Sequence, residues 1–85
     1  MKKLAILANP ASGKGKAIQA VQAAKRALWG WELEFHFPRS PDELRKTCQK
    51  LNKTTHEAAI VIGGDGTMND AIQGLLESGV PLCPF

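Results

Sequence analysis

Hydrophobic and polar positions along the chain follow two periods in turn, which predicts a regular succession of strands and helices. Short apolar runs and one strictly alternating segment predict four strands, at residues 3–8, 31–37, 58–62 and 80–85. Apolar residues at helical spacing predict three amphipathic helices, at residues 16–29, 41–51 and 67–77. The resulting order, β-α-β-α-β-α-β, is typical of a three-layer α/β fold with a parallel sheet and right-handed crossovers.

Within these elements, the same pattern predicts which side chains face the core. Those of the three helices are Ile18, Val21, Ala24 or Lys25, Leu28, Leu44, Cys48, Leu51, Met68, Ile72, Leu75 and Leu76. Those of the alternating strand are Trp31, Leu33, Phe35 and Phe37, with Trp29 expected to pack beside them. Local signals mark the helix ends: Ser40 as an N-cap followed by Pro41 and Glu43, and Gly30 and Gly79 as stops.

The composition is that of one small globular domain. The chain has 85 residues, of which 44% are apolar and 22% charged, and this excludes disordered, collagen-like and low-complexity classes. No apolar run approaches the ~20 residues that cross a bilayer. The apolar stretch at residues 4–8 is also shorter than the about 7–15 residues of a secretory signal. We therefore expect a cytoplasmic protein, in which Cys48 and Cys83 stay reduced.

The charged residues are unevenly distributed. The net charge is +3, but all 11 lysines and arginines precede residue 57, and only acidic charges follow. This arrangement suits a polyanionic ligand beside a metal ion, and equally a solvated surface of uneven charge. We expect no nucleic-acid partner, because the charge is modest and no nucleic-acid motif is present. The second helix carries a basic face that we expect to be solvated, with a peripheral membrane contact as the alternative. This face consists of Arg45, Lys46, Lys50 and Lys53.

Two glycine-rich loops, at residues 9–15 and 63–66, each follow a predicted strand and precede a predicted helix. In a parallel sheet they fall on the same edge, where open sheets of this kind bind ligands. Neither loop matches the two commonest phosphate-binding signatures. GxGxxG needs Gly or Ala where Asn69 stands, and GxxxxGK[ST] needs Ser or Thr where Ala17 stands.

The second loop nevertheless has the chemistry of an anion site. Its glycines let the backbone turn sharply and approach a ligand, and the amides at the start of the next helix point outward with the positive end of the helix dipole. Thr67 adds a hydroxyl. Asp65 would repel a phosphate unless it caps the helix, approaches a metal ion or accepts a proton from an attacking hydroxyl. The simpler alternative is a tight turn with Asp65 as a plain helix cap.

The first loop carries a weaker signal of the same kind. Ser12 can cap the following helix, and Lys14 and Lys16 can neutralise phosphate charge. The alternative is a Pro-Ser-Gly connection with solvated lysines. Its expected place on the same edge as the second loop favours a role in binding.

These motifs, in this order, resemble the diacylglycerol kinase catalytic-domain family, which includes bacterial lipid kinases, sphingosine kinases and ceramide kinases. The resemblance is carried by Asn-Pro-x-Ser-Gly at residues 9–13 and by Gly-Gly-Asp-Gly-Thr-x-Asn at residues 63–69, each after a strand. It extends from Leu4 to about Pro84. More distantly, the chain is similar to NAD kinases and 6-phosphofructokinases, which share the Gly-Gly-Asp-Gly loop.

The resemblance implies an ATP-binding N-terminal domain of a kinase that transfers the γ-phosphoryl group of Mg-ATP to a lipid hydroxyl, diacylglycerol-like or sphingoid. ATP and Mg²⁺ are the implied cofactors. Asp65 matches the motif carboxylate and is the implied catalytic residue, assisting the acceptor hydroxyl or organising the metal. The implied nucleotide-contacting residues are Asn9, Pro10, Ala11, Ser12, Gly13, Gly63, Gly64, Asp65, Gly66, Thr67, Met68 and Asn69.

The chain departs from the family pattern in three places, of which the mildest is Asp70, at a position where Glu is commoner. Members usually carry a threonine near the end of the second strand, whereas residues 34–40 contain none, and Ser40 is the candidate to replace it. Members also continue into a further nucleotide-binding segment and a large β-rich domain that holds the lipid pocket. Residues 1–85 are therefore expected to be a partial, truncated ATP-binding domain that is inactive alone and meets lipid only through the missing domain. The alternatives are a segment of an NAD kinase-like or other superfamily kinase, and a non-catalytic nucleotide-binding module.

Overall fold

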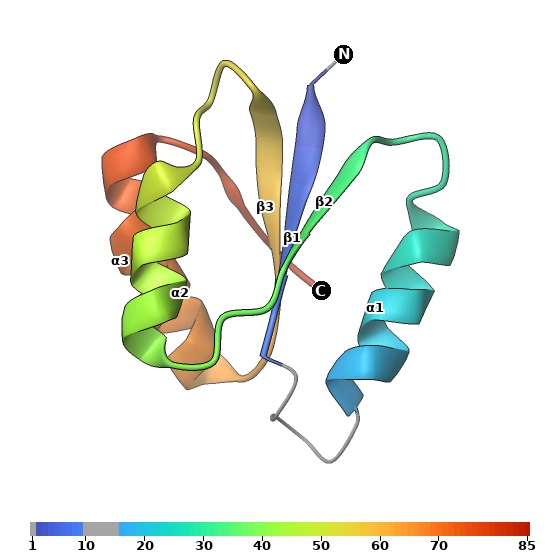
Figure 1. Cartoon of the computed structure of the whole chain (residues 1–85), viewed down its shortest axis with the longest axis horizontal. Coiled ribbons are helices and arrows are strands. Elements are labelled where there is room, and N and C mark those ends of the chain that lie inside the picture. Colours follow the sequence, from blue (N-terminus) through green and yellow to red (C-terminus); the bar gives the residue numbers. More distant parts are fainter. Residues whose placement is uncertain (1, 10–15) are drawn as a thin grey trace.

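A parallel four-stranded sheet lies between one helix on one face and two helices on the other (Figure 1). The computed structural model describes residues 2–9 and 16–85. The strands are β1 (Lys3–Ala8), β2 (Leu33–His36), β3 (His56–Ile62) and β4 (Leu82–Pro84), and the helices are α1 (Lys16–Ala27), α2 (Pro41–Lys50) and α3 (Asp65–Ser78). The predicted three-layer α/β fold and the order of its elements are confirmed.

The alternation of side chains along the two central strands separates two hydrophobic clusters. Leu4 and Ile6 of β1, with Ile60 of β3, pack on the face that α1 covers. Leu7 of β1 and Val61 of β3 point to the other face, where they meet α2 and α3. Because both faces of β1 and β3 are covered, these strands consist of nearly continuous apolar residues, as the sequence suggested.

The strand order places a topological switch point at the centre of the sheet. The strands are hydrogen-bonded in the order β2-β1-β3-β4, so the chain leaves β1 toward one edge and β3 toward the other. In open α/β sheets of this kind, ligands bind at such a point, beyond the carboxyl ends of the strands. In Figure 1 this edge lies at the bottom of the molecule.

The helix ends follow the predicted local signals. The side chain of Ser40 accepts a hydrogen bond from the backbone N–H of Glu43 at 3.1 Å, with Pro41 as the first residue of α2. Gly79 ends α3 in the left-handed conformation, with φ 74°, and donates its backbone N–H to Leu75 at 2.9 Å. Two boundaries differ by two residues: α1 ends at Ala27 rather than at residue 29, and α3 begins at Asp65 rather than at residue 67.

Three apolar side chains that were expected to face the core are instead exposed on the helices. Ile18 is 58% exposed and Leu76 is 77% exposed, and Ile72 is also exposed. The reason is that α1 turns Ala17 and Ala24 toward the sheet, and α3 buries small residues against its neighbours. Small side chains let the helix backbones approach closely, and the larger apolar residues then fall at the border of the buried face.

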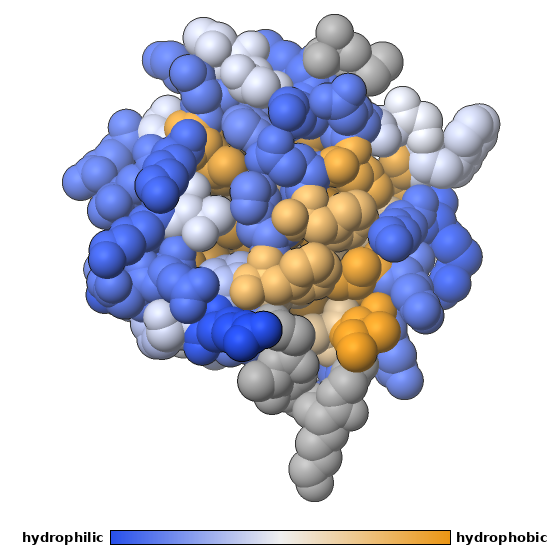
Figure 2. All heavy atoms as spheres, in the orientation of Figure 1, coloured by the Kyte–Doolittle hydropathy of each residue, from blue (hydrophilic) through white to orange (hydrophobic). Residues whose placement is uncertain are grey.

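The aromatic residues around β2 are also less buried than predicted. Trp29 is 84% exposed, and Trp31 and Phe37 are exposed as well. Because β2 is an edge strand of four residues, Trp31 and Phe37 lie beyond its ends, where the sheet no longer covers them. Apolar side chains accordingly gather at the surface over β2 and the adjacent side of α1 (Figure 2).

Among the described helices, none has the length and hydropathy needed to cross a membrane.

A polar network ties β2 to the two central strands. Glu34 accepts hydrogen bonds from Lys3 Nζ at 3.0 Å, His36 Nε2 at 2.7 Å and His56 Nε2 at 2.9 Å. The backbone N–H of Asn52 donates to Nδ1 of the buried His56, so that Nε2 carries the proton it shares with Glu34. Partial burial would raise the pKa of Glu34, but the three hydrogen bonds outweigh it and lower that pKa to about 2.

This network makes the stability of the fold sensitive to acid. Since the pKa of Glu34 is about 4.5 in the unfolded chain and about 2 in the fold, the stabilisation is complete above pH 4.5 and is lost as the pH falls toward 2. We expect the urea midpoint to drop across this range, and the Glu34→Gln variant to lose part of that dependence. Glu57→Gln is the control, because Glu57 lies 4.0 Å from Lys2 in a half-exposed pair. An identical acid profile for wild type and Glu34→Gln would contradict this assignment.

Candidate functional site

The two glycine-rich loops begin side by side at the carboxyl edge of the sheet. Ala8, the last residue of β1, is paired in register with Ile62, the last residue of β3. Asn9 and Gly63 therefore leave neighbouring strands at the same edge, as predicted. The other residues assigned to the first loop, Pro10, Ala11, Ser12 and Gly13, lie outside the described residues.

The three glycines of the second loop differ in what surrounds them. A Cβ at Gly63 would lie 2.7–2.8 Å from the side chain of Thr67, so the fold itself requires glycine there. At Gly64 and Gly66 nothing lies within 4 Å of the position that a Cβ would take, and neither glycine has a positive φ. Gly66 lies within α3, where glycine costs about 1 kcal/mol relative to alanine. The fold therefore does not explain these two glycines, whereas a ligand approaching the backbone would.

The first turn of α3 exposes its amides at the same place. The N-cap is Gly64, which provides no side-chain cap, and Asp65 is the first helical residue. Within the described part of the chain, the Asp65 side chain is exposed and forms no hydrogen bond or ion pair. The interpretation of Asp65 as a plain helix cap is therefore wrong. Its carboxylate is free to meet a metal ion or a proton donor, and the amides beside it are free to meet an anion.

The remaining predicted residues of this loop lie in the first turn of α3. Thr67 is half-buried against Gly63, and Asn69 is exposed. Met68 packs against the hydrophobic cluster under α2 and α3. Only the backbone of Met68 could therefore contact a ligand at this edge, whereas Thr67 and Asn69 could also use their side chains.

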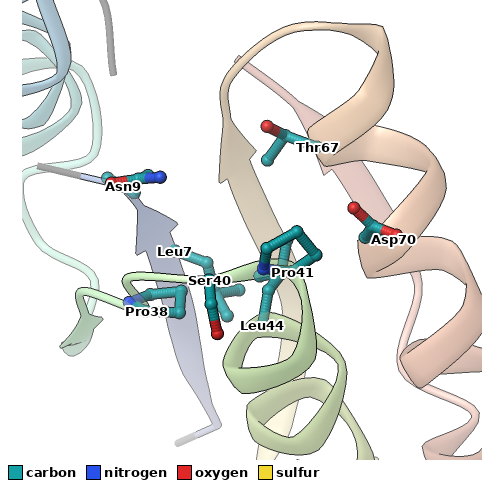
Figure 3. Close-up of a pocket in the computed structure, with 9 residues that line it drawn as sticks. Leu7, Asn9, Pro38, Ser40, Pro41, Leu44, Thr67 and Asp70 are labelled. Atoms are coloured by element: carbon teal, nitrogen blue, oxygen red, sulfur yellow. The ribbon is translucent and has the colours of Figure 1, made fainter. Parts of the chain in front are cut away.

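A small cavity of about 50 Å³ lies between the end of β1 and the starts of α2 and α3. Figure 3 shows Asn9, Ser40 and Pro41 around it, with Thr67 and Asp70 projecting from α3. Ser40 uses its hydroxyl as an acceptor for the backbone of α2 and lines the cavity at the same time. Asp70, which was not among the residues assigned to the site from the sequence, also lines this cavity. It lies three residues after Thr67, and this spacing places the two side chains on one face of a helix.

A second hollow, of about 300 Å³, lies on the α1 side of the glycine loop. Gly63 and Gly64 line it together with Lys16, the first residue of α1, and Phe85. Lys16 was predicted to neutralise phosphate charge as part of the first loop. In the fold it lies beside Gly63 and Gly64 of the second loop. The Gly63–Gly64 segment thus has a cationic residue on one side and the Thr67 cavity on the other.

The fold is that of a doubly wound α/β protein, with a glycine-rich loop and the uncapped start of α3 at its switch point. The family model of the diacylglycerol kinase catalytic domain matches residues 3–84. The chain therefore belongs to the diacylglycerol kinase catalytic-domain family, and the resemblance drawn from its two loops is confirmed.

Individual relatives agree with this assignment. Sphingosine kinase 1 of Homo sapiens is 32% identical over 79 residues, and that of Rattus norvegicus is 33% identical over 79 residues. Each match covers 88% of this chain and 20% of the relative. The chain thus spans about a fifth of the length of these curated relatives.

Solved structures share the fold. One, described as a diacylglycerol kinase of Bacillus anthracis str. Sterne, has a TM-score of 0.73 and 22% sequence identity, over 98% of this chain and 30% of that chain. The solution structure of a phosphate-loop protein has a TM-score of 0.62 and 10% identity, over 99% of this chain and 76% of that chain. At these identities, both comparisons support the architecture.

Proposed function

We propose that this chain is the ATP-binding part of a lipid kinase, which transfers the γ-phosphoryl group of Mg-ATP to a lipid hydroxyl, diacylglycerol-like or sphingoid. The observation that carries the proposal is the open backbone at Gly64 and Gly66, at the uncapped start of α3, in a chain of this family. The open space leaves room for phosphate oxygens to reach the amides of the first turn.

Phosphoryl transfer suits a site of this kind, because its catalysis consists mainly of positioning and charge neutralisation. The amides of the first turn of α3 would hold the phosphates, and the Thr67 hydroxyl would add a hydrogen bond. Lys16, beside Gly63 and Gly64, would neutralise part of their charge. Asn9 and the residues assigned to the first loop would complete the contacts from the neighbouring strand.

The residues at this edge fit a magnesium ion carried by the nucleotide. Mg²⁺ prefers oxygen ligands and is commonly bound by one or two carboxylates together with substrate phosphates. The exposed Asp65 carboxylate would supply one such ligand, or would accept the proton of the acceptor hydroxyl. Among the described residues, no group of three or more His, Cys, Asp or Glu side chains could hold a metal. The ion, when bound, would neutralise charge on the phosphates.

The chain is proposed to bind nucleotide without phosphorylating lipid by itself. It spans about a fifth of the length of the sphingosine kinases it matches. The two hollows described at the carboxyl edge, of about 50 Å³ and 300 Å³, are lined in part by Thr67, Asp70 and Lys16. A lipid tail would need a larger and more apolar cavity. Residues 1–85 would accordingly be a partial domain, and the lipid pocket would belong to a further part of a longer kinase.

Two measurements test the proposed function. Equilibrium dialysis of the chain with labelled ATP and Mg²⁺ should show saturable binding to a folded protein. Residues 3–84 should then replace the matched segment of human sphingosine kinase 1, and the chimera should transfer labelled phosphate to diacylglycerol or sphingosine when lipid and NAD are offered together. Absence of ATP binding would refute the nucleotide site, and transfer to NAD alone would refute the lipid acceptor.

A further inference from the structure

A row of ion pairs joins α2 to α3 beside the Thr67 cavity. Lys46 Nζ lies 3.0 Å from Asp42 Oδ2, and Arg45 lies 3.4 Å from Asp42 Oδ1 and 3.2 Å from Asp70 Oδ1. Lys46, with help from Arg45, holds the pKa of Asp42 below its ordinary value. The row contains two cations and two anions and is neutral as a whole. Because Lys46 is engaged with Asp42, Arg45 is the cation that balances Asp70.

The close packing of α2 and α3 brings Arg45 into this position. A Cβ at Gly74 would lie 2.5 Å from the backbone oxygen of Arg45, so the helices approach to a distance that only glycine allows. Gly74 lies four residues after Asp70, which places both on the same face of α3. The backbone of Arg45 therefore meets Gly74 while its guanidinium meets Asp70 one turn earlier. The Asp70 side chain is only 23% exposed.

Asp70 is also one of the residues that line the cavity together with Thr67. An uncompensated carboxylate at this place would repel a polyphosphate that approaches the first turn of α3. At several ångströms, and with an effective dielectric constant between the values for a protein surface and for water, such a repulsion weakens binding by roughly three- to tenfold. A cation held against Asp70 removes most of it.

We propose that Arg45 is a positioning residue for nucleotide binding, which acts through Asp70 by holding and neutralising its carboxylate at the cavity. This inference rests on the proposed ATP site. Arg45 itself does not line the cavity, and its guanidinium is directed to the two aspartates. Its contribution is therefore electrostatic and indirect, and it should disappear when Asp70 carries no charge.

A double-mutant cycle tests this role. The dissociation constant of Mg-ATP would be measured by equilibrium dialysis for wild type, Arg45→Gln, Asp70→Asn and the double variant. We expect Arg45→Gln to raise it roughly three- to tenfold at low salt, less at high salt, and Asp70→Asn to restore it within about twofold of wild type. Lys50→Gln, on the same helix, is the matched control, because among the described residues Lys50 forms no ion pair with Asp42 or Asp70 and its loss should leave the constant unchanged.

The outcomes separate this inference from the proposed function. If wild type binds Mg-ATP and Arg45→Gln binds equally well, the positioning role is overturned. It is also overturned if Asp70→Asn fails to rescue Arg45→Gln, or if Asp70→Asn alone abolishes binding. Arg45→Lys, which keeps the charge, should bind within about threefold of wild type, and it extends the test should Arg45→Gln unfold. Absence of binding by wild type overturns the nucleotide site and this inference together.

Discussion

Replacing Gly64 with valine is expected to remove most of the affinity of the chain for Mg-ATP while its fold remains intact. The fold has room for the new side chain, because nothing lies within 4 Å of its Cβ position and the φ of −87° suits any residue. The branched side chain would then fill the space through which phosphates reach the amides of α3. Losing one or two hydrogen bonds to a charged group, about 1.5–3 kcal/mol each, should raise the dissociation constant at least tenfold.

Gly64→Ala provides the graded comparison. Its single methyl group intrudes less, so the dissociation constant should fall between those of wild type and Gly64→Val. Thermal unfolding should show the same midpoint for all three proteins within a few degrees, which separates a loss of binding from a loss of fold. Equal affinities across the series would show that the ligand does not approach Gly64, and the phosphate loop would have to be placed elsewhere.

The order of elements could be predicted because its signals are local. The uniformly apolar residues of β1 and β3 indicate strands covered on both faces, and Ser40 and Gly79 mark helix ends through contacts within a few residues. A sheet of parallel strands then places the ends of β1 and β3 at one edge without further information. The place of the site was therefore predictable from the sequence to the level of which strand ends lie side by side.

The depth of burial could not be predicted in the same way, because it depends on neighbours that the sequence does not indicate. Ile18 and Leu76 have the spacing of core residues, yet the helices turn alanine and glycine inward instead. The edge position of β2 likewise decides that Trp31 and Phe37 are exposed. The periodicity of a helix or strand indicates which face is buried, but close packing with the neighbouring elements decides which residues on that face lose their contact with solvent.

Long-range polar contacts were the other part that the sequence left open. Lys3, Glu34 and His56 come from three different strands, and Arg45 and Asp70 are 25 residues apart. None of these pairs has a sequence spacing that predicts contact. Asp70 could have been nominated from its position one turn after Thr67, but its partner on α2 could be found only once the packing of the two helices was known.

Replacing Gly74 with alanine should have the largest effect on stability. The added Cβ would lie 2.5 Å from the backbone oxygen of Arg45 and 2.6 Å from the Cβ of Cys48, so α2 and α3 must separate. Overpacking of this kind costs about 1–3 kcal/mol against a gain of about 1 kcal/mol in helix propensity, so the expected net loss is up to about 2 kcal/mol. Burial raises the pKa of the Cys48 thiol to about 11, so this side chain is neutral at the contact between α2 and α3. The predicted loss of stability therefore comes from steric overlap alone.

The same substitution at Gly66, in the same helix, is the matched control. Nothing lies within 4 Å of its Cβ position, so Gly66→Ala should leave the free energy of unfolding unchanged or raise it by up to about 1 kcal/mol. Urea denaturation should thus show a lower free energy of unfolding for Gly74→Ala and no loss for Gly66→Ala, whereas Mg-ATP binding should be impaired chiefly by Gly66→Ala. Similar shifts in both variants would mean that the close approach of α2 and α3 does not limit stability. Because Arg45 takes its position from that approach, its contact with Asp70 would then need another cause.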